Sequence, residues 1–217
     1  MRGAAGASGN FRIFAARPRL YPAGSVTGAV KAFVITGPSG VGKGTVIRAL
    51  RERHPEIGLS ISATTRAPRE GEEDGVDYHF MSDDEFDRRV AAGEFVEHAA
   101  YSGNKYGTLR SELERHHETG GVVLEIELQG ARQIRQAMPE ALQIFIAPPT
   151  PGTLRERLIG RGTDSAADIE RRLKVAEEEL AARGEFAHVV VNDDLERAVD
   201  ELERIVGAAG RAPAGQD

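Results

Sequence analysis

The sequence predicts an α/β domain with a mostly parallel central sheet, and three observations lead to that fold class. Short apolar runs rich in Val, Ile and Leu are typical of buried strands. Amphipathic stretches with helical spacing follow most of these runs. The two kinds of segment alternate, as they do where helices connect parallel strands.

The first expected strand is residues 32–36, an apolar run that ends in a glycine loop. Residues 43–53 are expected to form a helix, because apolar side chains recur at helical spacing until a His-Pro pair stops it. Residues 59–63 follow as a second strand. The charged stretch 66–75, which contains Gly and Pro, is expected to be a loop.

Further elements follow in the middle of the chain. Ser82 suits the cap of a helix beginning near Asp83, and its acidic first turn suits the helix dipole. Residues 108–119 are expected to form another helix. Residues 121–128 and 142–147 are expected strands, because they consist largely of apolar and β-branched residues.

The last third continues the alternation. Two prolines end the preceding strand and open a helix expected to run through Ile159. A long helix is expected over residues 166–183, a short strand over 189–191 and a final helix over 195–206.

Composition excludes several classes of protein. The chain has 217 residues, which suits one domain, and no cysteine, which excludes disulfides and cysteine-based zinc sites. This fits a reducing compartment, so we expect the cytoplasm. No apolar run is long enough to span a membrane, and a net charge of −6 disfavours broad nucleic-acid binding. Homo-oligomerisation remains open.

The two ends differ from the rest. Residues 1–30 hold four arginines and no acidic residue, a charge of +4, so residues 31–217 carry −10 and the whole chain −6. We interpret residues 1–30 as a disordered extension, with a transit-type peptide and a basic arm as alternatives. Residues 208–217 are expected to be a flexible tail, which leaves one domain over 31–207.

A phosphate-binding loop lies between the first strand and the first helix. Glycines there let backbone N–H groups surround a phosphate, and the helix N-terminus adds its positive dipole end. Lys43 can reach the β- and γ-phosphates of a nucleotide. The alternative, a tight turn with an exposed lysine, fits this context poorly. The expected loop residues are Gly37, Pro38, Ser39, Gly40, Val41, Gly42 and Lys43.

One position departs from the usual loop. Ser or Thr normally follows the lysine and binds Mg²⁺ through its hydroxyl, but here Gly44 and then Thr45 follow. The Gly-Lys-Gly-Thr form is similar to the loop of adenylate kinases. Nucleotide binding should survive, because backbone amides carry it. Thr45 remains a candidate metal ligand, and the alternative is Mg²⁺ held by phosphates and water.

Residues 60–80 contain two arginines three positions apart, Arg66 and Arg69, with a proline between them. Two guanidinium groups can hold a phosphate dianion, and the hydroxyls of Tyr78 and Tyr106 can add donors. The alternative is that both arginines are surface charges paired with nearby glutamates.

This segment resembles the GMP-binding signature of guanylate kinases. The resemblance continues through Phe95-Val96-Glu97-His98, Ser102 to Thr108, Leu124 to Gly130, Arg157 to Asp164 and Val191 to Asp194. It implies ATP as phosphoryl donor, GMP as acceptor and Mg²⁺ as the metal. It also implies a P-loop fold with a partly antiparallel GMP-binding insert, roughly 62–125, and a lid, roughly 157–172.

The resemblance implies a base pocket as well. Glu97 and Glu127 would accept the N1–H and 2-amino hydrogens of guanine, while Ser62 and Thr108 complete the pocket. The family more often has Asp where this chain has Glu127, so the carboxylate here is one methylene longer, and guanine selectivity should hold. The alternative for Glu125 and Glu127 is one exposed strand face, and for Glu97 a solvated side chain.

On the ATP side, the resemblance implies that Arg157, Arg161 and Arg172 clamp the phosphates and that Asn192 lies near adenine. With Lys43, the arginines would stabilise charge on the moving phosphoryl group. Surface ion pairs are the alternative for the arginines, and a helix cap for Asn192. Two other functions stay open: a guanylate-kinase-like binding module without catalysis, and a kinase for a different nucleoside monophosphate.

Overall fold

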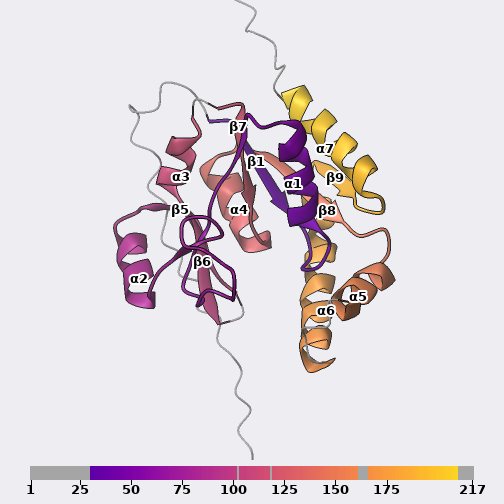
Figure 1. The fold of residues 1–217 in the computed structure, drawn as a ribbon, viewed down its shortest axis with the longest axis horizontal. Coiled ribbons are helices and arrows are strands. Elements are labelled where there is room, and N and C mark those ends of the chain that lie inside the picture. The colour runs from indigo at the N-terminus through magenta and orange to yellow at the C-terminus, as the bar shows by residue number, and fades with distance from the viewer. Residues whose placement is uncertain (1–29, 102, 118, 161–165, 210–217) are drawn as a thin grey trace, which may run out of the picture.

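The central sheet of the protein has five parallel strands. The computed structural model describes residues 30–101, 103–117, 119–160 and 166–209. The strand order is β2-β7-β1-β8-β9 (Figure 1). Its strands are β1 (Ala32–Thr36), β2 (Ile57–Leu59), β7 (Gly121–Glu125), β8 (Leu142–Ala147) and β9 (His188–Val191). The parallel ladders confirm the predicted fold class.

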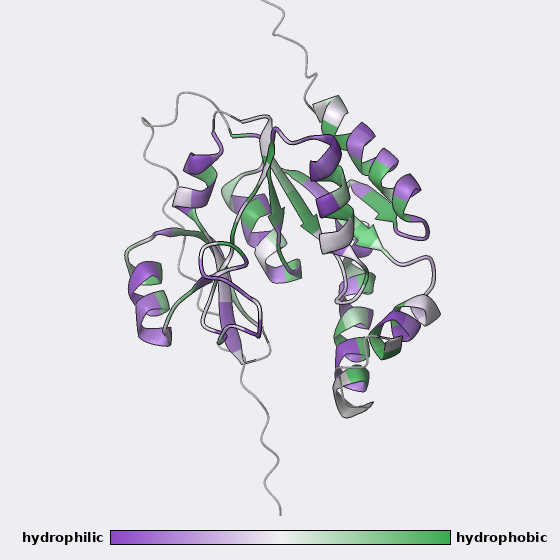
Figure 2. Ribbon diagram, viewed as in Figure 1, coloured by the Kyte–Doolittle hydropathy of each residue, from purple (hydrophilic) through white to green (hydrophobic). Residues whose placement is uncertain are grey.

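Helices cover both faces of this sheet. One face holds α1 (Lys43–Arg53) and α7 (Leu195–Ala209), and the other holds α4 (Leu128–Ala137). Side chains of β1 alternate between the two layers: Phe33 and Ile35 pack with α1, and Val34 packs with α4. The apolar strands lie between helices whose outer sides are hydrophilic (Figure 2). Burial on both faces explains why these strands are continuous apolar runs.

A second sheet has four strands in the order β4-β3-β6-β5. Its strands are β3 (Ala63–Thr64), β4 (His79–Phe80), β5 (Phe95–Tyr101) and β6 (Asn104–Leu109), and α2 (Asp83–Ala91) packs against it. The β3–β6 and β5–β6 pairs are antiparallel. All of these elements fall within the expected insert, residues 62–125. Ser82 caps α2 as predicted, since its hydroxyl accepts a hydrogen bond from the Glu85 N–H.

Four further helical segments complete the described fold. They are α3 (Arg110–Arg115), α5 (Pro151–Gly160), α6 (Ala166–Ala181) and the short 3₁₀ helix η1 (Ala182–Glu185). Every helix in the described part of the chain is too short or too polar to cross a lipid bilayer. The expected extensions at 1–30 and 208–217 lie almost wholly outside the described residues.

Two expected elements in the first half of the chain are wrong. The strand expected at 59–63 is two strands, because the chain leaves the central sheet after Leu59 and joins the second sheet at Ala63. The helix expected at 108–119 starts only at Arg110, since Thr108 pairs with Glu97 in the β5–β6 ladder. Tertiary pairing overrides local pattern at both places.

The strand expected at 121–128 ends at Glu125, and α4 after it was not expected. Glu127 is the N-cap of α4, and glutamate is not a usual cap, so the common start signal is missing. The helix expected at 166–183 also ends earlier, at Ala181, and passes into η1.

Candidate active site

The loop between β1 and α1 curls around its own lysine. Gly42 is the left-handed N-cap of α1, with φ of 97°. Gly37 has φ of 146°, and a Cβ there would lie 2.2 Å from the Ile146 carbonyl oxygen. Both positions therefore require glycine. The Lys43 Nζ donates to the Gly37 carbonyl over 2.6 Å, which places an ammonium group inside the loop.

Two side chains hold the loop from outside. The Asn192 Nδ2 donates to the Val41 carbonyl over 2.8 Å. The Arg157 Nη1 donates to the same carbonyl over 2.8 Å, and its Nη2 donates to the Asn192 carbonyl over 2.9 Å. Asn192 is buried, so these bonds form where water does not compete. The network ties β9 and α5 to the phosphate loop.

A buried carboxylate lies across the site from the loop. Glu97, on β5, is 3% exposed, and the Thr108 hydroxyl donates to its Oε1 over 2.7 Å. A Cβ at Gly130 would lie 2.6 Å from its Oε2, so the glycine in α4 leaves the space that this carboxylate fills. Burial raises the pKa of Glu97 to about 8, and the neighbouring Glu127 charge adds to the shift.

Glu127 stands at the beginning of α4. Its carboxylate accepts hydrogen bonds from the Gln129 and Gly130 N–H groups, over 3.1 and 3.2 Å. Burial raises the pKa of Glu127, while these two amides and Lys43 oppose the shift. Two N–H bonds leave lone pairs on both oxygens for a ligand.

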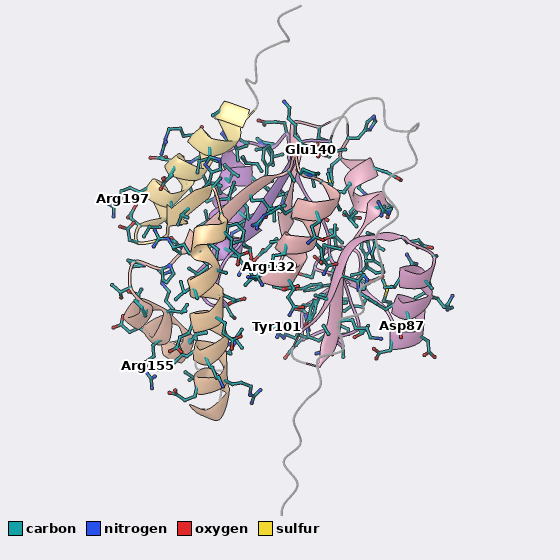
Figure 3. The ribbon with its side chains drawn as sticks, turned by 180° about the vertical axis from the view of Figure 1, so that it is seen from behind. Asp87, Tyr101, Arg132, Glu140, Arg155 and Arg197 are labelled. Carbon is teal, nitrogen blue, oxygen red and sulfur yellow. The ribbon has the colours of Figure 1, made fainter. Side chains whose placement is uncertain are left out.

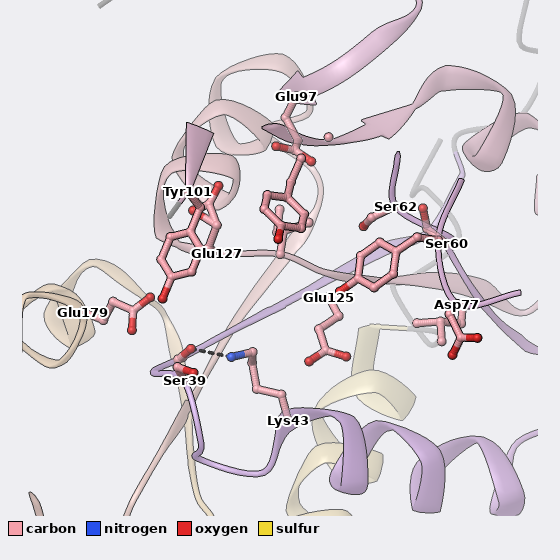
Figure 4. A pocket seen from close by; sticks show the side chains of 16 residues that line it. Ser39, Lys43, Ser60, Ser62, Asp77, Glu97, Tyr101, Glu125, Glu127 and Glu179 are labelled. Carbon is pink, nitrogen blue, oxygen red and sulfur yellow. Dashed lines mark hydrogen bonds between the residues drawn. The ribbon is translucent and has the colours of Figure 1, made fainter. Parts of the chain in front are cut away.

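Lys43, Glu97 and Glu127 line one cavity of about 320 Å³ between the central sheet and the second sheet (Figure 4). The cavity brings together eight residues expected from the sequence: Gly37, Ser39, Lys43, Ser62, Tyr78, Glu97, Tyr106 and Glu127. Thr108 reaches it through its bond to Glu97.

The paired arginines lie next to this cavity, and they are not among the described residues that line it. The Arg66 Nη2 bonds the Glu72 carboxylate over 2.8 Å, and its guanidinium lies over the Tyr78 ring, 5.2 Å from the centroid. The other Glu72 oxygen accepts from the Arg69 backbone N–H over 2.7 Å. Glu72 thus contacts the side chain of Arg66 and the backbone of Arg69. The ring centroids of Tyr78 and Tyr106 are 6.2 Å apart.

Comparison with known proteins identifies the family. A family model described as guanylate kinase matches residues 29–209. The guanylate kinase of Synechococcus sp. (strain CC9311) is 54% identical over 186 residues, which are 85% of this chain and 96% of that one. The guanylate kinase of Frankia casuarinae is 57% identical over 170 residues, covering 78% and 92%. The chain belongs to the guanylate kinase family.

A solved guanylate kinase agrees in structure as well. The crystal structure of guanylate kinase from Anaplasma phagocytophilum has a TM-score of 0.69 and 34% sequence identity, over 85% of this chain and 89% of that one. The predicted fold, with its central parallel sheet and second mixed sheet, is therefore that of the guanylate kinase family.

Other expected residues lie outside the cavity lining of this guanylate kinase family member. Arg172, on α6, donates to the Ser39 hydroxyl over 3.1 Å. Thr45 is exposed on the first turn of α1. Arg161 lies outside the described residues. The loop residues Pro38, Gly40, Val41, Gly42 and Gly44 shape the loop without lining the cavity.

The cavity also contains polar side chains that sequence reasoning missed: Ser60, Asp77, Tyr101, Glu125 and Glu179. Glu125 ends β7, the neighbour of the strand that precedes the loop, and ligands of α/β sheets bind at such strand ends. That signal was available in the sequence. Glu179 lies two helical turns after Arg172, on the same face of α6. Its only signal in the sequence was this helical spacing from an expected site residue.

Proposed function

We propose that the protein transfers the γ-phosphoryl group of ATP to GMP or dGMP, giving ADP and GDP or dGDP. One observation carries the proposal: a single cavity has the phosphate-loop lysine on one wall and the buried Glu97, with Glu127 beside it, on another. The loop suits a nucleoside triphosphate and the carboxylates suit guanine. The reaction would take place in the cytoplasm.

Guanine recognition rests on two carboxylates held from different elements. Glu97 comes from β5 and Glu127 from the N-terminus of α4. Both can accept from the N1–H and 2-amino groups of guanine, whereas adenine presents a lone pair at N1. Adenine would leave the buried carboxylates without hydrogen-bond donors, and such unpaired groups strongly lower the affinity for the wrong base. Ser62 and Thr108 add hydroxyls to the same pocket.

The phosphate of GMP would bind to Arg66, Arg69, Tyr78 and Tyr106. Arg66 still has donors beyond those it uses on Glu72 and Ala67, because a guanidinium carries five. The ion pair raises the pKa of Arg66 and lowers that of Glu72, so both stay charged. The arginine is therefore oriented before GMP arrives.

On the ATP side, Lys43 and the loop amides would bind the phosphates, with Arg161 and Arg172 adding positive charge. Arg157 and Asn192 already hold the Val41 carbonyl, so we propose that they contribute by keeping the loop in shape. Phosphoryl transfer depends mainly on such positioning and electrostatic stabilisation.

The residues near the phosphate loop fit a Mg²⁺ ion bound to the phosphates of ATP. Gly44 has no hydroxyl, but a Cβ there would lie 3.6 Å from Glu125 Oε2, so this carboxylate reaches the place of the missing side chain. No group of three or more His, Asp or Glu in the described ranges could hold a metal, which suits Mg²⁺ bound to phosphates and one carboxylate. Glu125 would hold the ion, which neutralises phosphate charge.

The test is ADP release measured with ATP, Mg²⁺ and each of GMP, dGMP, AMP, CMP and UMP. We expect turnover with GMP far above that with AMP. Turnover with AMP instead would identify a kinase for another nucleoside monophosphate. Folded protein that binds GMP without turning it over would indicate a binding module and overturn the proposed reaction.

A further inference from the structure

Helix α6 contacts the phosphate loop at Ser39 with two side chains. Arg172 donates to the Ser39 hydroxyl over 3.1 Å, and the Ser39 backbone N–H lies close enough to the Glu179 carboxylate to lower its pKa. The two side chains are seven residues apart, with the buried Ala176 between them, so they share one face of the helix. The position of α6 is therefore tied to the conformation of the loop.

Glu179 has one oxygen without a partner. The side chain is 8% exposed, and its Oε2 is buried with no hydrogen bond to any described residue. Burial raises the pKa of Glu179 to about 7, against the opposing effects of Lys43 and the Ser39 amide. A buried carboxylate oxygen without a donor is costly, so this oxygen is suited to a donor that arrives in another state of the protein.

Tyr101 presents such a donor from the other side of the cavity. It ends β5, in the second sheet, and lies at the end of that strand when the molecule is seen from behind (Figure 3). Its hydroxyl points toward the Glu179 carboxylate (Figure 4). Among the described residues this hydroxyl has no hydrogen-bond partner. Burial and the Glu179 charge raise the pKa of Tyr101, so the hydroxyl keeps its proton at neutral pH.

We propose that Tyr101 and Glu179 are positioning residues whose hydrogen bond, from the Tyr101 hydroxyl to Glu179 Oε2, closes the active site around both nucleotides. The inference rests on the proposed transfer from ATP to GMP. Tyr101 moves with the sheet that holds Glu97, and Glu179 moves with the helix that holds Arg172. The bond would therefore bring the acceptor and the phosphate-stabilising arginine together for the transfer step.

Single-turnover rates of phosphoryl transfer, measured by rapid quench, test this bond separately from product release. Tyr101→Phe should lower the rate about tenfold, since a buried side-chain hydrogen bond contributes on that order, and should leave the Kd values for GMP alone and for ATP alone unchanged. Glu179→Ala should lower it further, because the Ser39 contact is lost too. Glu177→Ala, an exposed neighbour on α6, is the control.

The double variant decides whether the two residues act together. Tyr101→Phe in the Glu179→Ala background should have no further effect on the transfer rate. Independent, multiplicative effects would overturn the proposal, as would a Tyr101→Phe variant with the parent rate. Absence of GMP phosphorylation by the parent protein would instead overturn the proposed function.

The proposed closure can be followed directly by measuring the distance between spin labels on α2 and α6. The chain has no cysteine, so Arg88→Cys on α2 and Lys174→Cys on α6 provide the only two sites for spin labels. With GMP and a non-hydrolysable ATP analogue, the label distance should shorten in the parent. It should shorten less in the Tyr101→Phe background. Equal shortening in both would show that the hydroxyl does not hold the closed state.

Discussion

The Thr108 hydroxyl donates to Oε1 of Glu97 over 2.7 Å, across the ladder of β5 and β6. The pair is buried, and this bond lowers the pKa of Glu97 against a larger effect of burial, which raises it to about 8. The carboxylate is thus held in place for a ligand but is largely protonated at neutral pH without one.

GMP binding should therefore release a proton from Glu97. The bound base donates hydrogen bonds to the ionised form, so affinity should rise as pH increases toward about 8 and then level off. Calorimetry between pH 7 and 8.5, in buffers of different ionisation enthalpy, measures the protons released. The GMP phosphate is already a dianion in this range. Proton release unchanged in Glu97→Gln would contradict the assignment.

The raised pKa of Glu97 also determines how the stability of the protein changes with pH. The folded protein keeps a proton on Glu97 that the unfolded chain loses above its usual pKa of 4.5, so the nucleotide-free protein should become less stable between pH 4.5 and about 8. Glu97→Gln should flatten that part of the profile. Chemical unfolding of both proteins across this range checks it.

Gly130→Ala should weaken GMP binding by about tenfold or more, because the new Cβ would lie 2.6 Å from Glu97 Oε2 and displace the carboxylate. ATP affinity should stay the same. Gly207→Ala is a matched control in helix α7, where a Cβ meets nothing within 4 Å. Normal GMP affinity in Gly130→Ala would mean that Glu97 does not bind the base in this position.

Asn192→Asp should weaken ATP binding by about tenfold and lower stability by about 1–3 kcal/mol, since the donor to the Val41 carbonyl becomes a second acceptor. GMP affinity should change little. Asp193→Asn, at the exposed next position, is the control. Nucleotide titrations and thermal unfolding measure both effects. A loss of GMP affinity equal to that of ATP would indicate general damage rather than a disturbed loop.

Glu125→Gln should weaken binding of Mn²⁺, used in place of Mg²⁺, to the ADP complex by about tenfold. Gly44→Ser fits without strain, since its Cβ would be in ordinary contact with Glu125, and the added hydroxyl should strengthen that binding. Electron paramagnetic resonance counts free Mn²⁺ independently of turnover. Glu140→Gln, on the exposed surface, is the control. Equal Mn²⁺ affinity in all four proteins would exclude Glu125 as a metal-holding group.

Hydrophobic periodicity and glycine signals predicted correctly those elements whose bounds depend on neighbouring residues in the sequence. The β1 strand and the α1 helix have the expected bounds, because a buried apolar run and a glycine loop specify them within a few residues. Helix α4 was missed because its cap is Glu127 and its first turn contains Gly130. Both residues belong to the proposed base pocket, where Glu127 lines the cavity and Gly130 leaves space for Glu97, so the local signal for a helix is weak at this point.

The same contrast applies to the site. Lys43 could be placed from its loop alone, since the loop holds the lysine by a bond to its own backbone. Tyr101 and Glu179 could not be placed in this way. They are 78 positions apart in the sequence, and they line the same cavity only because the second sheet and α6 pack on either side of it. Contacts of this kind depend on tertiary structure and leave no short-range pattern.

The chain crosses from the central sheet to the second sheet between Leu59 and Ala63, and this has a thermodynamic consequence. Glu97 lies in the second sheet, whereas Glu127 caps α4 on the central sheet, so local unfolding of the second sheet alone would dismantle the proposed guanine pocket while sparing the phosphate loop. Part of the free energy of GMP binding would then appear as slower amide exchange in β5 and β6. The apparent affinity for the acceptor would thus report how often its sheet opens.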